Sequence, residues 1–215
     1  MMSRHARHFG CLVALVAACA AQAASLEVSI VDTSGQPLPD AVAYAIPAGA
    51  PVEARGRPTA VIEQVDREFV PYVSVIQTGT AVTFPNRDAI LHHVYSFSPA
   101  KPFEIRLYTG KSPTEIVFDK PGTVTLGCNI HDWMTAYVLI VGTPHFGHAD
   151  ARGVVRLQEV PAGTYELRAW HPHQRAAVAP HAVTLQATGA EKAAFVVDAA
   201  PRKARYKPPL DRLRY

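Results

Sequence analysis

Three residues that can bind a soft metal ion recur at every third position of the segment CNIHDWM, residues 128–134. They are Cys128, His131 and Met134. A cysteine thiolate and a methionine thioether favour copper, and imidazole suits copper as well. The spacing alone fits either a metal site or three buried residues at the end of a strand, so other parts of the chain must decide between them.

A further histidine is available in the segment NRDAILHHV, residues 86–94. A blue-copper centre uses two histidines and one cysteine in a plane, with a weak axial methionine. Both His92 and His93 stand in this segment. Alternation groups His93 with Leu91 and Phe97 on the more apolar face of a strand, which favours His93 as the inward residue.

The segment 68–141 resembles a cupredoxin, and amicyanin-like cupredoxins in particular. The resemblance rests on paired strands in EFVPYVSVIQTGTAVTF, on Asn86 six residues before His92, and on the short C-x2-H-x2-M loop. It covers about a third of the chain. It favours His92 over His93, because the family has an asparagine after its ligand histidine that bonds across to the ligand loop. The metal ligands that the resemblance implies are His92, Cys128, His131 and Met134.

The ligand loop departs from the family at Asp132 and Trp133, where amicyanins carry prolines beside the histidine. Asp132 places a charge where such proteins usually expose an apolar docking patch. Trp133 either packs under the loop or forms an exposed contact that conducts electrons. Both residues bear on which partner the protein would bind.

Other metal and catalytic readings fit the sequence less well. A binuclear copper centre needs a second cysteine where Val124 stands, and multicopper oxidases need several His-x-His pairs, of which the chain has one, HPH at 171–173. A methionine ligand argues against zinc. No nucleophile set, phosphate loop or haem motif is present, so we do not expect an enzyme. His171 and His173 are expected to be solvated loop residues rather than a second metal site.

The elements that must position these residues are predicted to be strands. The chain has 215 residues, 48% apolar content and 18 prolines, and no long stretch has helical periodicity. This pattern favours an all-β fold. Successive short strands predict a Greek-key sandwich or barrel for the central part. The expected strands include 26–31, 41–46, 72–77, 80–84, 92–97, 103–108, 114–118, 123–128 and 136–141.

The segments before and after this central part carry turn motifs of one kind. Asp32, Gly35 and Pro37 form a D-x-x-G-x-P turn, and a P-A-G-x-Y-x-L turn follows at 161–167. Both resemble the transthyretin-like or carboxypeptidase regulatory-like β-sandwich, so a second small sandwich is expected, split by an insertion. The predicted domains are a signal peptide at 1–23, a split sandwich at 24–58 and 143–200, a cupredoxin domain at 59–142, and a basic disordered tail at 201–215.

The N-terminus has the features of an export signal: arginines, a short apolar run and small residues before Ala24. A rival interpretation takes VAAC, residues 16–19, as a lipobox that would lipidate Cys19. With cleavage after residue 23, Cys128 becomes the single cysteine of an exported chain, which excludes an internal disulfide and favours a buried or metal-bound thiol. The formal net charge is +3, but the predicted tail alone carries six basic residues and one Asp, so the rest of the chain is not basic and no face for nucleic acid is expected.

Together these features predict a periplasmic type 1 copper protein, similar to exported cupredoxins of the methylamine utilization type. The expected role is one-electron transfer between a dehydrogenase-type donor and a cytochrome-type acceptor, with membrane contact only if Cys19 is lipidated. The alternatives are a copper-delivery protein that does not shuttle electrons, and an interaction module without a metal. The basic tail could dock on an acidic partner or lipid, but a solvated tail is the simpler expectation.

Overall fold

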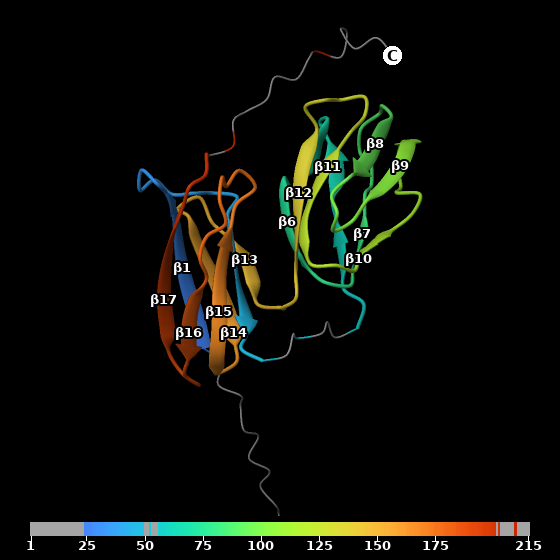
Figure 1. Ribbon diagram of the computed structural model, residues 1–215. Coiled ribbons are helices and arrows are strands. Elements are labelled where there is room, and N and C mark those ends of the chain that lie inside the picture. The colour runs from blue at the N-terminus through green and yellow to red at the C-terminus, as the bar shows by residue number, and fades with distance from the viewer. Residues whose placement is uncertain (1–23, 50–51, 53–55, 201, 203–208, 210–215) are drawn as a thin grey trace, which may run out of the picture.

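A computed structural model describes residues 24–49, 52, 56–200, 202 and 209 (Figure 1). These residues form seventeen strands, and no helix occurs among them. The all-β prediction is therefore confirmed. The predicted signal, with Cys19, and nearly all of the predicted tail lie outside the described residues. In the part of the chain that the structure describes, no helix has the length and apolar character needed to span a bilayer.

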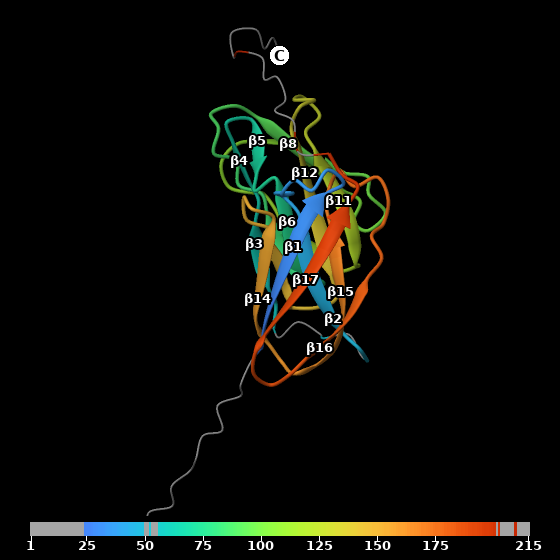
Figure 2. The same cartoon turned by 90° about the vertical axis from the view of Figure 1, so that its left-hand side faces the viewer.

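The first sandwich combines both flanks of the chain, and we call it the split sandwich. One of its sheets has the order β14-β1-β17, and the other has the order β13-β2-β15-β16. Their bounds are β1 Ala24–Asp32, β2 Val42–Pro47, β13 Phe146–His148, β14 Val154–Val160, β15 Gly163–Trp170, β16 His181–Leu185 and β17 Ala190–Val197. Strand β1 lies between an antiparallel neighbour, β14, and a parallel neighbour, β17 (Figure 2).

The core of the split sandwich follows from period-two patterning. In β1 the side chains of Leu26, Val28 and Ile30 are buried, and the residues between them are partly exposed. Successive side chains of a strand point to opposite faces, so these three share the inner face. They pack with Leu167 and Phe195 from the later strands. Burying each such side chain contributes about 1.5–3 kcal/mol, so this shared core ties the two flanks together.

The second sandwich is formed by the middle of the chain, and we call it the central sandwich. A five-stranded sheet has the order β6-β12-β11-β8-β9, and it faces a three-stranded sheet with the order β10-β7-β3. A short hairpin, β4–β5, lies beside them. The bounds are β3 Thr59–Val61, β4 Glu63–Val65, β5 Glu68–Val70, β6 Val73–Gln77, β7 Thr80–Thr83, β8 His92–Ser96, β9 Phe103–Tyr108, β10 Ile116–Phe118, β11 Gly122–Gly127 and β12 Thr135–Val141.

The two sandwiches share an apolar interface. Figure 1 shows β6 and β12 on the side of the central sandwich that faces the split sandwich. Buried residues from both sandwiches meet there, namely Val42, Val73, Val75, Leu139 and Val141. In the split sandwich, strands β1 and β2 pair with strands that follow residue 142. This is the arrangement expected if the central sandwich is inserted. The exact domain boundaries stay a prediction.

A close backbone approach joins the two flanks at Gly153. Its φ is +73°, and a Cβ atom there would lie 2.3 Å from the carbonyl oxygen of Ile30 in β1. Gly35 has a similar φ of +80°, but a Cβ atom there would meet nothing within 4 Å. A substitution at Gly35 would therefore cause backbone strain alone, whereas one at Gly153 would cause both strain and steric overlap.

We expect Gly153→Ala to lower the free energy of unfolding by about 3 kcal/mol or more, because backbone strain and overlap add. The matched variant Gly35→Ala should cost only about 1 kcal/mol, the usual penalty for a left-handed alanine. Urea unfolding followed by circular dichroism measures both. Equal losses in the two variants would contradict the close packing of β1 against the 150–153 turn.

Candidate metal centre

Strand pairing brings the segments 86–94 and 128–134 together. Strands β8 and β11 are antiparallel, with Gly127 opposite Tyr95. The start of β8 therefore lies beside the end of β11, where the loop 128–134 begins. The backbone N–H of His93 accordingly points at the Cys128 sulfur, at 3.5 Å.

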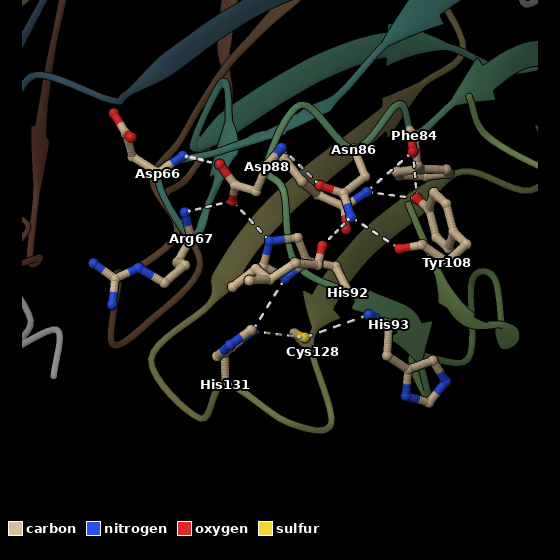
Figure 3. Close-up of polar contacts among 12 residues, drawn as sticks. Asp66, Arg67, Phe84, Asn86, Asp88, His92, His93, Tyr108, Cys128 and His131 are labelled. Carbon is tan, nitrogen blue, oxygen red and sulfur yellow. Dashed lines mark hydrogen bonds and ion pairs between the residues drawn. The ribbon is translucent and has the colours of Figure 1, made fainter. Parts of the chain in front are cut away.

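Three side chains converge between these segments (Figure 3). The Nδ1 atoms of His92 and His131 are 3.0 Å apart, and Nδ1 of His131 lies 3.6 Å from Sγ of Cys128. The ligand atoms of all three residues lie within 4.8 Å of one another. His92 and His131 are 0% exposed and Cys128 is 3% exposed. The sequence prediction placed the same three residues in one site.

The two spacings from Nδ1 of His131 fit a single metal ion. Nitrogen and thiolate ligands bind a metal such as zinc at about 2.0–2.3 Å, so two ligand atoms on one ion lie at most about 4.6 Å apart. The distances of 3.0 and 3.6 Å satisfy this limit. Two imidazoles and one thiolate form the planar donor set of a blue-copper site. Among the described residues, no other group of three or more His, Cys, Asp or Glu side chains has such an arrangement.

Met134, the fourth predicted ligand, ends the same loop. Its side chain is 1% exposed and belongs to the buried cluster that contains Cys128. Its backbone N–H donates to the carbonyl of His131 at 2.9 Å, which closes a turn between the two residues. Met134 thus lies on the buried side of the loop, in the same apolar cluster as Cys128.

The side chains of the adjacent residues His92 and His93 point in different directions. His92, Val94 and Ser96 point inward on β8, whereas Leu91 and Phe97 are exposed. The expectation from alternation, that the more apolar face lies inward, is therefore wrong. The outer face of β8 carries aromatic rings instead.

The His93 ring points away from His92, Cys128 and His131 in Figure 3. Its Nε2 lies 3.0 Å from a carboxylate oxygen of Glu104, in the neighbouring strand β9. The side chain of His93 therefore contacts strand β9 rather than the ligand cluster. The backbone N–H of His93 is the part of this residue that faces the cluster.

The polar groups around the cluster determine its charge. Burial lowers the pKa of His92, although the contact with Asp88 acts in the opposite direction. Burial, with further contributions from His92 and Arg67, lowers the pKa of His131 to about 4. Both imidazoles are therefore neutral at pH 7, the state in which a ring nitrogen can bind a metal.

Asp88 is a residue of the site that the sequence reasoning did not assign. Its Oδ2 lies 2.7 Å from Nε2 of His92, and its carboxylate also accepts the backbone N–H groups of Asp66 and Arg67 at 2.8 and 2.9 Å. Burial alone would raise the pKa of Asp88, but these hydrogen bonds outweigh burial and lower it. The sequence holds one indication of this role, because Asp88 stands four residues before the ligand histidine His92. Its other partners come from a turn some twenty residues away, which no local pattern indicates.

Asn86, noted in the sequence for its spacing, has a structural role. It is buried, and its amide nitrogen donates to the carbonyls of Ile90 and Tyr108, at 2.8 Å each. Its side-chain oxygen accepts the N–H of Asp88 at 2.9 Å. These bonds fix the loop that leads into His92.

Trp133 and Asp132, where the loop departs from the family, have different environments. Asp132 is exposed. Trp133 is partly buried, its ring lies 5.1 Å from that of His131, and its indole N–H donates to the carbonyl of Arg67 at 3.2 Å. Trp133 thus packs against the ligand while part of its side chain reaches solvent, and its role as an electron conduit stays a prediction.

The other histidines considered from the sequence lie in the split sandwich. His171 is 1% exposed, so the expectation that it is a solvated loop residue is wrong. Its neighbour His173 bonds through Nε2 to the hydroxyl of Tyr72, at 2.8 Å. This contact links the split sandwich to the central one.

No protein-family model and no curated protein matches this chain. Solved structures that are similar include a copper-containing nitrite reductase from Thermus scotoductus SA-01, at 24% identity and TM-score 0.38; the match covers 44% of this chain and 25% of that one. A purple cupredoxin from Nitrosopumilus maritimus matches at 22% identity and TM-score 0.34, over 39% of this chain and 99% of that one. The reduced Cu(I) form of a mutant amicyanin matches at 20% identity and TM-score 0.35, over 46% and 98%.

The low pKa of His131 predicts acid sensitivity of the metal-free protein. The unfolded chain takes up this proton near pH 6.5, whereas the folded chain does so near pH 4. Between these values the unfolded state binds more protons, so stability rises with pH and is lost on acidification.

The variant His131→Asn should therefore lose less stability than the wild type when the pH falls from 7 to 4.5. Urea unfolding in the presence of a chelator at the two pH values measures the difference. The same loss in both proteins would contradict a buried neutral His131.

Proposed function

We propose that this chain is an exported type 1 copper protein that carries single electrons between periplasmic redox partners. The observation that supports the proposal is the assembly of His92, Cys128 and His131, with three ligand atoms within 4.8 Å of one another and almost no solvent exposure. Met134 would supply the weak fourth ligand. The proposed donor is a dehydrogenase-type protein and the proposed acceptor a cytochrome-type protein.

Bound copper would supply reversible one-electron cycling between Cu(II) and Cu(I). The residues of this chain would hold the ion in one geometry. His92 is fixed by Asp88 at 2.7 Å, and Cys128 receives the N–H of His93 at 3.5 Å. His131 lies between the His92 ring and Trp133. A dry, packed ligand set resists rearrangement when the charge changes, which favours fast electron transfer.

The burial of the ligands favours a carrier over the alternative of copper delivery. A delivery protein must expose its ligands so that the ion can pass to an acceptor. Here His92 and His131 have no solvent exposure, and the partly buried Trp133 packs against His131. Electron transfer needs no contact between the partner and the metal itself, so a buried site is compatible with it. An enzyme would have to admit its substrate to the metal, so the buried ligands also favour a carrier over an enzyme.

Loading the mature protein with Cu(II) should produce an intense visible band from the Cys128 thiolate. The band should bleach on reduction and return on oxidation. Cys128→Ser is expected to abolish the band entirely, because a serine hydroxyl cannot supply the thiolate. Visible absorption and redox titration test this. Tight Cu(I) binding without the band would support delivery, and no binding at all would reject both.

The adjacent histidines provide a matched pair of variants. His92→Asn should lower copper affinity about 100-fold or more, since loss of a ligand should exceed the 10–100-fold typical of its outer partners. His93→Asn should bind copper within a few-fold of wild type, because the backbone N–H that faces Cys128 is retained. Competition titrations with a copper chelator measure both affinities. A larger loss in the His93 variant would reverse the ligand assignment.

A further inference from the structure

We propose that Asp88 is a positioning residue that fixes the His92 ring in one tautomer and ties the metal centre to the β4–β5 turn. The inference rests on the metal centre proposed above, but its first test uses the metal-free protein. Figure 3 shows the arrangement: the Asp88 carboxylate lies between the backbone of Asp66 and Arg67 on one side and the His92 ring on the other.

The carboxylate determines which ring nitrogen of His92 carries hydrogen. An ionised carboxylate can only accept hydrogen bonds, so Nε2 of His92, 2.7 Å from Oδ2 of Asp88, must be the donor. A neutral imidazole carries one N–H. Nδ1 of His92 is then bare and faces Nδ1 of His131 at 3.0 Å, a distance that accommodates one hydrogen and not two. Asp88 thus leaves the metal-facing nitrogen of His92 free to bind.

The position of the carboxylate is itself fixed. Oδ1 accepts the N–H of Asp66 at 2.8 Å, and Oδ2 accepts the N–H of Arg67 at 2.9 Å in addition to the His92 bond. The backbone N–H of Asp88 is bound to Asn86 at 2.9 Å. With both oxygens engaged and its own backbone held, the carboxylate cannot rotate away from His92 without losing several hydrogen bonds.

The β4–β5 turn needs this carboxylate in return. Asp66 and Arg67 have φ values of 53° and 59°, which L-residues other than asparagine and aspartate rarely adopt. A two-residue hairpin turn with both central residues at positive φ usually contains glycine, and here it does not. Such strain persists where surrounding contacts over-determine the conformation. The two N–H···carboxylate bonds to Asp88 are such contacts.

The same turn also reaches the opposite side of the centre. The carbonyl of Arg67 accepts the indole N–H of Trp133, the residue that packs against His131. The hairpin is anchored in the sandwich by buried Phe69 and by buried Gln64, whose amide donates to the carbonyl of Phe84 at 3.0 Å. One rigid turn therefore holds the supports of both histidines, through Asp88 for His92 and through Trp133 for His131.

The first test needs no variant and no metal. Two-bond ¹H–¹⁵N correlation spectra of the ¹⁵N-labelled, metal-free wild-type protein at pH 7 report which nitrogen of each imidazole carries hydrogen. We expect His92 to be the Nε2–H tautomer. Hydrogen on Nδ1 of His92 would overturn the proposal, whatever the protein does with copper.

The second test compares Asp88→Asn with Asp150→Asn. Asp150 also accepts two backbone N–H groups in a turn, those of Arg152 at 2.9 Å and Val154 at 3.0 Å, but it lies in the split sandwich and contacts no proposed ligand. An asparagine has one acceptor oxygen and no charge, so it cannot satisfy all the donors that face Asp88. The control variant removes the charge of a turn carboxylate, with its contacts to Arg152 and Arg156, without touching His92.

We expect Asp88→Asn to weaken binding of Co(II), a redox-silent probe ion, about 10- to 100-fold, the usual effect of losing an outer partner of a ligand. Asp150→Asn should bind within about twofold of wild type. With copper, Asp88→Asn should raise the reduction potential, because loss of a negative charge beside His92 disfavours the more positive oxidised state. Unchanged affinity and potential in a folded Asp88→Asn protein would overturn the proposal. Absence of metal binding by the wild type would instead reject the proposed function.

Discussion

The central constraint on the metal centre is the close approach of two fully buried imidazoles. Nδ1 of His92 and Nδ1 of His131 are 3.0 Å apart, and a thiol lies beside them. Buried polar groups of this kind are costly unless each has a partner. The cost is offset by a surrounding set of polar contacts, of which Asp88 is the centre, and it would be offset further by an ion that all three side chains bind. A strand pairing, a hairpin turn and a loop of seven residues all contribute to keeping the two rings in place.

These contacts form a hierarchy. The pairing of β8 with β11 sets where His92 and Cys128 meet, and it depends on the apolar core beneath both strands. The hairpin β4–β5 then restrains the polar shell above that core, since Asp88 bonds to its turn. Each layer is stable only because the layer below it is packed, so the rigidity of the site is a property of the whole sandwich and not of the loop alone.

The sequence was sufficient for local features and insufficient for contacts between distant segments. Period-two patterning predicted strand 103–108 with the bounds that the structure has for β9, and residue types predicted which side chains could share a site. Alternation failed on β8 because the outer face of this strand carries exposed Leu91 and Phe97, so apolar character did not indicate the inward side. The link from Asp88 to Asp66 joins residues that are brought together only by the tertiary fold.

The placement of β1 between β14 and β17 has a consequence for the order of folding. The first strand of the described chain is a central strand of its sheet, yet its parallel partner begins at Ala190. Strand β1 therefore cannot complete its sheet until almost the whole chain is present, because β17 is needed for the pairing. Folding of the central sandwich makes the later pairing easier. Ala81 bonds to the carbonyl of Pro58 and Thr78 to that of Val141, which places its entry and exit beside one β6–β7 turn. Once it has folded, the entropy of closing the long loop between β1 and β14 falls to that of a much shorter connection. The inserted sandwich thus lowers the entropic cost of assembling the split sandwich that encloses it in sequence.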